Sequence, residues 1–226
     1  MLFTKKMKLA DLVINNHKLV LILQRFNIAL GFGEKTIDDV CQQNNVPVDF
    51  FLLICNVYTN DQYLPSSNEL SQINMVQLIP YLTASHNYYL QERIPHIENH
   101  LHHIADHCYP SHHDTLLKFF RDYKDEVSKH FQYEEFTVFP YINNLHKNVK
   151  STGYSIQQFE ENHSNIEDKL SDLTNIILKY IPGDVLPNER ISLLFDIFQL
   201  ADDLNTHSLI EEKILIPYVQ TLENNL

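Results

Sequence analysis

The feature that most constrains the fold is a pattern of histidine, glutamate and apolar residues that occurs twice, at an offset of 77 positions. The first copy contains His130 followed four residues later by Glu134, and the second contains His207 followed by Glu211. In both copies a Pro-Tyr pair stands six residues after the glutamate. A gap-free match of this kind indicates that one structural unit has been used twice.

The apolar residues around these motifs follow helical spacing. Four stretches show it: Leu82 to Ile104, Leu116 to Tyr141, Ile156 to Tyr180 and Leu193 to Tyr218. The last two alternate steps of three and four residues, and the first is less regular. This spacing is typical of the core seam of a bundle helix, and we expect Pro95 to bend the first helix. Each stretch carries a histidine at a core position. The sequence therefore predicts an all-α protein built on an up-down four-helix bundle.

A smaller helical module precedes the bundle. In residues 1–62, short apolar stretches are separated by glycines, and Thr36 with Asp39 three residues later predicts a capped helix start. Residues 63–71 contain a Leu-Pro-Ser-Ser-Asn segment and read as a linker, so that 72–226 form the bundle. We expect few contacts to cross this linker.

The repeated motif predicts a metal site in the bundle core. Residues four apart on a helix point into nearly the same region, so each HxxxE pair can serve one site. The predicted ligands are His86, His130, Glu134, His163, His207 and Glu211. Two bare carboxylates in an apolar core need a cation. Carboxylates that bridge two metal ions, together with imidazoles that complete the coordination of each ion, suit a pair of iron ions. We expect a non-haem di-iron centre with an oxo or hydroxo bridge and open positions for a small molecule.

Other carboxylates near these positions receive different predictions. An isolated HxxxE pair is usually a solvated pair on a helix face, but here the motif recurs on apolar seams. Glu167 also forms HxxxE with His163, yet its counterpart at the same offset is Leu90, so we do not expect it to bind metal. Glu126 and Asp203 stand one turn before ligand histidines. They are either surface carboxylates or residues that support the ligands from behind.

The chain has 13 histidines, and a second group of them follows one side of the first long helix. His96, His100, His103 and His107 make up this group, and none has a histidine counterpart in the second copy. They lie beside the apolar stripe of that helix. We expect them to form a solvated face, with adventitious metal binding as the alternative.

Composition excludes several classes of partner. The formal charge is −12 and no basic stripe offsets it, which argues against a nucleic acid or an anionic membrane as the partner. No apolar run is long enough to cross a bilayer, and the first residues lack the apolar core of a secretory signal. Three cysteines without CxxC spacing indicate reduced thiols, and we expect the protein to be cytoplasmic.

Together these motifs resemble the iron–sulfur cluster repair di-iron proteins of the hemerythrin-like superfamily, over essentially the whole chain. In the bundle the resemblance rests on His86, His130 with Glu134-Glu135, Val138-Phe139-Pro140, Asn162-His163, and Asp203-Leu204 with His207 and Glu211. In the N-terminal module it rests on Phe26-Asn27-Ile28 and on Gly33 to Ile37. Two departures stand out: Gly31 and Phe32 occupy the place of a common cysteine pair, and Asn162 the place of a frequent glutamate.

The resemblance implies a hemerythrin-like bundle that acts in nitrosative or oxidative stress. The family is linked to restoring damaged iron–sulfur proteins, by iron donation or by nitric-oxide chemistry at the di-iron site. The alternative is a non-catalytic sensor or binder of dioxygen, nitric oxide or iron. The sequence leaves open whether the protein turns over as an enzyme and whether it forms a homodimer, and it assigns no catalytic residue.

Overall fold

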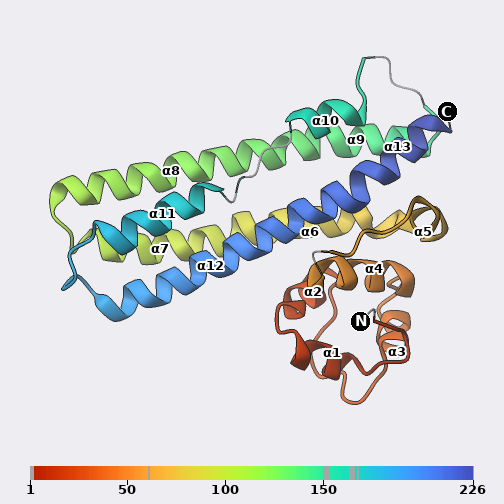
Figure 1. Ribbon diagram of the computed structural model, residues 1–226, viewed down its shortest axis with the longest axis horizontal. Coiled ribbons are helices and arrows are strands. Elements are labelled where there is room, and N and C mark those ends of the chain that lie inside the picture. Colours follow the sequence, from red (N-terminus) through yellow and green to blue (C-terminus); the bar gives the residue numbers. More distant parts are fainter. Residues whose placement is uncertain (1–2, 61, 150–152, 163–165, 167, 226) are drawn as a thin grey trace. The chain divides into compact units, whose positions relative to one another are not determined.

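A computed structural model describes residues 3–60, 62–149, 153–162, 166 and 168–225. The fold is an all-α helical bundle, as predicted, and the described part of the chain contains no strand. The early helices are α1 (Leu9–Asn15), α2 (Leu19–Arg25), α3 (Ile37–Gln43), α4 (Val48–Thr59), α5 (Ser67–Gln72), the 3-10 turn η1 (Met75–Gln77) and α6 (Leu78–Tyr88). The later ones are α7 (Ile94–Ala105), α8 (Pro110–Tyr133), α9 (Phe139–His146), α10 (Ile156–Asn162), α11 (Asp168–Lys179), α12 (Pro187–Ile210) and α13 (Ile216–Asn224) (Figure 1).

The chain divides into two compact units. Unit 1 comprises Met1–Ser85, Ile142–Glu161 and Thr206–Leu226. Unit 2 comprises His86–Tyr141 and Asn162–Asn205.

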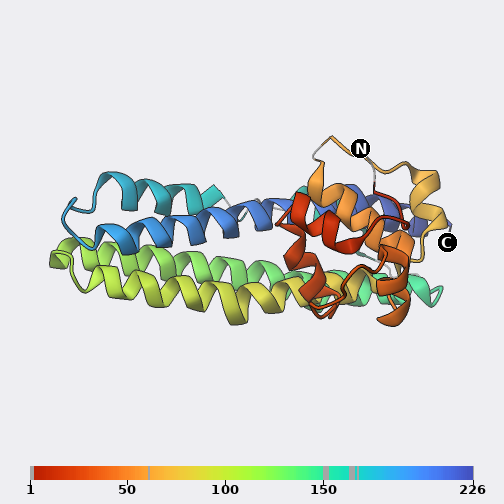
Figure 2. The same cartoon turned by 90° about the horizontal axis from the view of Figure 1, so that it is seen from below.

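Unit 2 is built on four helices, α7, α8, α11 and α12, which run side by side in both views (Figures 1 and 2). Its core is lined by the residues that the sequence placed on apolar seams. The fully buried members include Ile94, Ile97, Leu101 and Ile104 of α7, Leu116, Phe120, Tyr123, Val127 and Phe131 of α8, Leu170, Leu173 and Ile177 of α11, and Leu193, Ile197, Leu200 and Leu204 of α12. Burial of these stripes, at about 1.5–3 kcal/mol per large side chain, is what holds the four helices together.

In unit 1, the N-terminal module forms its own small core from α1 to α4. The predicted cap at the start of α3 is confirmed. Thr36 Oγ1 accepts a hydrogen bond from the Asp39 backbone N–H at 3.2 Å, and Asp39 Oδ2 accepts one from the Thr36 N–H at 3.0 Å. This reciprocal pair satisfies two backbone donors that the first turn of a helix otherwise leaves open.

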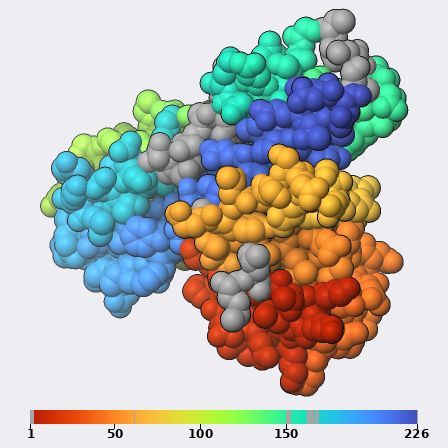
Figure 3. Space-filling view, turned by 45° about the vertical axis from the view of Figure 1, so that its right-hand side comes forward, coloured from red at the N-terminus to blue at the C-terminus, as the bar shows by residue number. Residues whose placement is uncertain are grey.

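The module also packs against α6, which the sequence did not predict. The buried Arg25 guanidinium donates hydrogen bonds to the hydroxyls of Tyr58 and Tyr81, at 3.5 and 3.4 Å, and lies 5.8 Å from the centre of the Tyr81 ring. Phe26 packs against the same ring, with centroids 5.1 Å apart and the planes tilted by 39°. In the space-filling view the gold and orange segments of α4 to α6 form one continuous surface (Figure 3). Residues before and after the linker are therefore in contact, through aromatic rings packed around the buried guanidinium of Arg25.

Three π-helical segments interrupt the long helices, and a proline follows each at the same distance. They are η2 (Tyr89–Arg93), η3 (Glu134–Val138) and η4 (Glu211–Leu215). Pro95, Pro140 and Pro217 each stand two residues after the segment ends. A proline inside a helix lacks an N–H and clashes with the carbonyl four residues earlier, and the wider π turn relieves that conflict.

The first π segment changes the core pattern that the sequence predicted. Leu90 was expected on the apolar seam, but it is only partly buried, and Tyr89 is fully buried in its place. The step from Tyr89 to the next core residue, Ile94, is five residues long instead of four. The extra residue of the π turn causes this shift, because it rotates the helix face between the two positions.

The cysteines lie where thiols are unreactive. Cys41 and Cys55 are buried and free, and Cys108 is free and partly buried. Burial raises the pKa of Cys41 to about 12 and that of Cys55 well above its ordinary value. Buried thiols of this kind stay protonated and act as small apolar side chains.

No helix in the described part of the chain is both long and apolar enough to span a membrane.

We predict that Arg25→Ala lowers the free energy of unfolding by about 1–3 kcal/mol, because it leaves two buried hydroxyls without their donor. Urea unfolding followed by circular dichroism measures the loss. Arg121→Ala serves as the control, since Arg121 is exposed on α8. Equal stability of the two variants would show that the contact between α2 and α6 contributes nothing.

Candidate metal centre

His86 lies in the last turns of α6 and is held on three sides. Its ring stacks on Phe131 with centroids 4.1 Å apart and an interplanar angle of 12°. Its Nδ1 lies 2.9 Å from Oε1 of Glu135, and its Nε2 lies 3.0 Å from Oε2 of Glu134. The aromatic contact and the two carboxylates fix the orientation of the imidazole.

The tautomer of His86 follows from these contacts. A carboxylate can only accept, so the Nδ1–H of His86 donates to Glu135. In the neutral ring Nε2 then carries a lone pair, and it faces the carboxylate oxygen of Glu134. Two acceptors 3.0 Å apart are stable only with a cation between them, either a proton on the ring or a metal ion.

Glu134 begins the π segment η3 and is completely buried. Neither of its carboxylate oxygens accepts a hydrogen bond in good geometry from a described residue. Its nearest groups are imidazole nitrogens: Nε2 of His130 lies 2.8 Å from Oε1, and Nε2 of His86 lies 3.0 Å from Oε2. A buried carboxylate surrounded by imidazoles and lacking hydrogen bonds is a donor set that a metal ion would complete.

The second copy of the motif has the same local structure. Glu211 begins η4 and is fully buried, and His207, one turn earlier on α12, is 1% exposed. Nε2 of His207 lies 3.3 Å from Oε1 of Glu211. Both glutamates thus sit at the first position of a π turn. Such turns are frequent at functional sites, and they re-aim side chains relative to the preceding helix.

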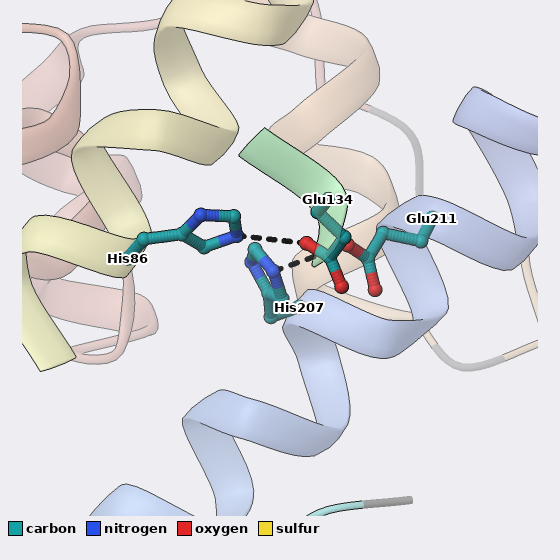
Figure 4. A group of neighbouring side chains, drawn as sticks. All are labelled: His86, Glu134, His207 and Glu211. Carbon is teal, nitrogen blue, oxygen red and sulfur yellow. Dashed lines mark ion pairs between the residues drawn. The ribbon is translucent and has the colours of Figure 1, made fainter. Parts of the chain in front are cut away.

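Four of the predicted residues gather in one group. One ligand atom from each of His86, Glu134, His207 and Glu211 lies within 4.8 Å of the others, and all four residues are buried (Figure 4). Imidazole nitrogen and carboxylate oxygen are ligands that iron, zinc and similar ions accept. The arrangement can therefore hold metal with groups that are costly to bury otherwise.

Of the other two predicted ligands, only His130 belongs to the described residues, and it lies next to this group of four. His130 adjoins it through Glu134 and is 10% exposed. His163 lies outside the described residues, as does Glu167, so the structure says nothing of either.

Glu135 is a site residue that the sequence did not single out. Its hydrogen bond with His86 lowers its pKa below the ordinary value for a glutamate. Its side chain is 34% exposed, so it connects the buried imidazole with solvent. A carboxylate behind a metal-binding histidine orients the ring and raises its basicity. The doubled glutamate of the motif, Glu134-Glu135 and again Glu211-Glu212, was the available signal.

The two carboxylates predicted as supporting residues lie in different environments. Asp203 is buried, and its backbone carbonyl accepts a hydrogen bond from the Tyr89 hydroxyl at 3.2 Å. Glu126 is 40% exposed and forms an ion pair with Lys169. The surroundings of Glu126 are those of a surface carboxylate, and a supporting role for either residue stays a prediction.

Comparison with known proteins identifies the domain that carries these residues. The family model described as the hemerythrin HHE cation binding domain matches residues 78–219, which is more than half of the chain and includes all six predicted ligands. Neither the curated proteins nor the solved structures gave a match.

We predict that Glu134→Gln and Glu211→Gln each remove most of the bound metal, because an amide keeps the shape of the side chain but not its charge. Metal per chain is measured by elemental analysis after reconstitution. Glu98→Gln is the control, since Glu98 pairs with Lys124 at the surface of unit 2. Metal contents that match the wild type in both variants would mean that the wrong carboxylates were chosen.

We predict that Glu135→Gln weakens metal affinity about 10–100-fold while the helices stay intact, the effect expected when a partner behind a ligand loses its charge. Competition with a chelator of known affinity measures it, with circular dichroism as the test of folding and Glu98→Gln again as the control. If the variant binds metal with the affinity of the wild type, the hydrogen bond between Glu135 and His86 does not contribute to metal binding.

Proposed function

Since the chain belongs to the hemerythrin HHE cation-binding family, we propose that its bundle holds two iron ions. The ligands in this proposal are His86, His130, Glu134, His163, His207 and Glu211. Three observations support it: the family match, the buried group of two histidines and two glutamates, and the recurrence of the motif at one offset.

Each residue type has a separate task in this proposal. Glu134 and Glu211 would supply negative charge to the iron ions, and each is fully buried at the start of a π turn. The histidines complete the coordination as neutral donors. The bound iron would supply redox chemistry and open positions for a small molecule such as nitric oxide or dioxygen. The protein's own part is to exclude water and to hold the imidazoles in one tautomer.

We propose that the protein acts in nitrosative or oxidative stress, as a repair factor for iron–sulfur proteins. What supports this proposal is the small predicted ligand set: four histidines, where the dioxygen-carrying hemerythrins that the chain resembles use an additional one. A less saturated site holds iron more loosely, which favours iron donation or nitric-oxide chemistry over reversible oxygen carriage. Glu135 adds support, because it joins buried His86 to the surface and provides a carboxylate at which iron or protons can pass.

The second candidate is a non-catalytic sensor of dioxygen, nitric oxide or iron. One specific contact favours it: the N-terminal module packs on Tyr81, which lies on the same helix as His86 and little more than one turn before it. A change of metal state that displaces His86 together with α6 would also displace Tyr81, and through Tyr81 it would reach Arg25 and Phe26. In this role the module would report the state of the site to a partner or a second copy of the chain.

The two candidates differ in what happens to nitric oxide and iron. Anaerobically reconstituted protein is given nitric oxide with an electron donor, and in a separate experiment an iron–sulfur protein damaged by nitric oxide. Continued consumption of nitric oxide, or recovery of the damaged cluster with loss of iron from this protein, supports the repair role. Binding that stops at one equivalent, with iron retained and no recovery, supports the sensor.

We predict that reconstituted protein holds two irons per chain and that they are magnetically coupled. Two buried glutamates shared between metals would place the ions close enough to interact. Iron analysis gives the count, and Mössbauer spectroscopy with electron paramagnetic resonance tests the coupling. One iron per chain, or two that behave as isolated ions, would overturn the di-iron proposal.

A further inference from the structure

A second group of metal-binding side chains lies on the outer surface of unit 2. His96 and His100 stand one turn apart on α7, and Asp196 projects from α12 beside them. One ligand atom from each of the three lies within 4.8 Å of the other two. The sequence predicted a solvated face here, and His96 is indeed exposed, but it could not show that a carboxylate from another helix faces the pair.

The distances between these atoms are those of ligands that share one small ion. Oδ2 of Asp196 lies 3.2 Å from Nε2 of His96, with which it forms a hydrogen bond while no ion is bound, and 3.7 Å from Nδ1 of His100. In a tetrahedral zinc site with bonds of about 2.0–2.1 Å, neighbouring ligand atoms are about 3.3 Å apart. The two observed distances bracket that value. The two imidazole rings lie 4.5 Å apart, so both can face the same point.

The nitrogen of His100 adds a second, independent sign of a ligand. Its Nδ1 is shielded from solvent and has no hydrogen-bond partner among the described residues. At 3.7 Å from Asp196 it is too far for a hydrogen bond. The His100 side chain as a whole is 43% exposed, but its enclosed Nδ1 lacks a partner, and an ion between Nδ1 and the Asp196 carboxylate would supply one.

The carboxylate is already oriented for this task. Arg93 donates to Oδ1 of Asp196 at 3.1 Å and to Oε1 of Gln199 at 2.9 Å. This contact occupies one oxygen and leaves Oδ2 toward the histidines. A hydrogen-bonded partner behind a carboxylate ligand is a usual feature of metal sites, since it fixes the direction of the free oxygen.

We propose that His96, His100 and Asp196 form a second metal site, selective for zinc or a similar transition-metal ion and completed by water. Two imidazoles and one carboxylate are a common set of protein ligands for zinc with an open fourth position. The site is distinct from the proposed iron centre, because His96 lies ten residues beyond His86, about 15 Å along the helix. Its ligands come from α7 and α12, so a bound ion would link these two helices of unit 2.

The test uses the full-length chain after its iron has been loaded, with Zn²⁺ alone as the added ligand. Calorimetry is expected to show one further Zn²⁺ per chain, with iron content unchanged. His100→Ala and Asp196→Asn should each weaken this binding by at least about tenfold, since loss of even an outer partner costs that much. His103→Ala is the matched control: His103 is exposed on the same helix but pairs with Glu189. Addition of Co²⁺ in place of Zn²⁺ should give the visible spectrum of a tetrahedral ion.

Three outcomes would overturn the proposal. If Asp196→Asn binds Zn²⁺ as the wild type does, the carboxylate is no ligand. If His103→Ala loses as much affinity as His100→Ala, binding is adventitious and spread along the histidine face. If iron is released as Zn²⁺ binds, the zinc has entered the bundle core. Because iron is measured in every sample, failure of the zinc site is separable from failure of the iron centre.

Discussion

The structure is organised by the complete burial of two glutamate side chains inside an apolar bundle. Removing a carboxylate from water costs several kcal/mol unless positive charge or hydrogen bonds replace the lost solvation. Around Glu134 the replacement consists of imidazoles, with nitrogens at 2.8 and 3.0 Å and no hydrogen bond in good geometry from the described residues. Imidazoles alone satisfy a carboxylate only if they carry protons, whereas a shared cation satisfies carboxylate and imidazole together. This requirement explains why histidine recurs at core positions where an apolar residue would otherwise pack better.

The two buried glutamates also coincide with irregular stretches of helix. A regular α-helix carrying apolar residues on its seam has no reason to widen, yet η3 and η4 begin at the buried glutamates, and a proline follows each segment by two residues. The proline removes one backbone donor and forces the turn open, so the glutamate is presented at an angle that a regular helix would not give. Pro140 and Pro217 therefore belong to the site, although neither offers a ligand. Pro95 follows a π segment that begins at Tyr89. There the buried residue is a tyrosine, whose hydroxyl donates a hydrogen bond to the Asp203 carbonyl.

Local patterns in the sequence were enough to predict the helices and the cap at Thr36, because spacing along one helix determines which face a residue occupies. What could not be predicted depends on register or on partners distant in sequence. Leu90 was placed in the core because the inserted residue of a π turn leaves no mark in apolar spacing. The contact of Asp196 with the histidine face joins residues about a hundred positions apart, and no periodicity announces it. Glu135 was visible as half of a repeated pair, but only the structure shows its hydrogen bond to His86.

One helix, α6, carries both a contact of the N-terminal module and the predicted ligand His86. Tyr81 receives the buried guanidinium of Arg25 and the ring of Phe26, and His86 follows five residues later. A helix transmits displacement along its axis because its backbone hydrogen bonds resist stretching, so the two ends of this segment cannot move freely of each other. The buried thiols of the module stay protonated and serve as packing side chains. If His86 binds metal as proposed, a module that packs on the same helix is suited to sense or set its position.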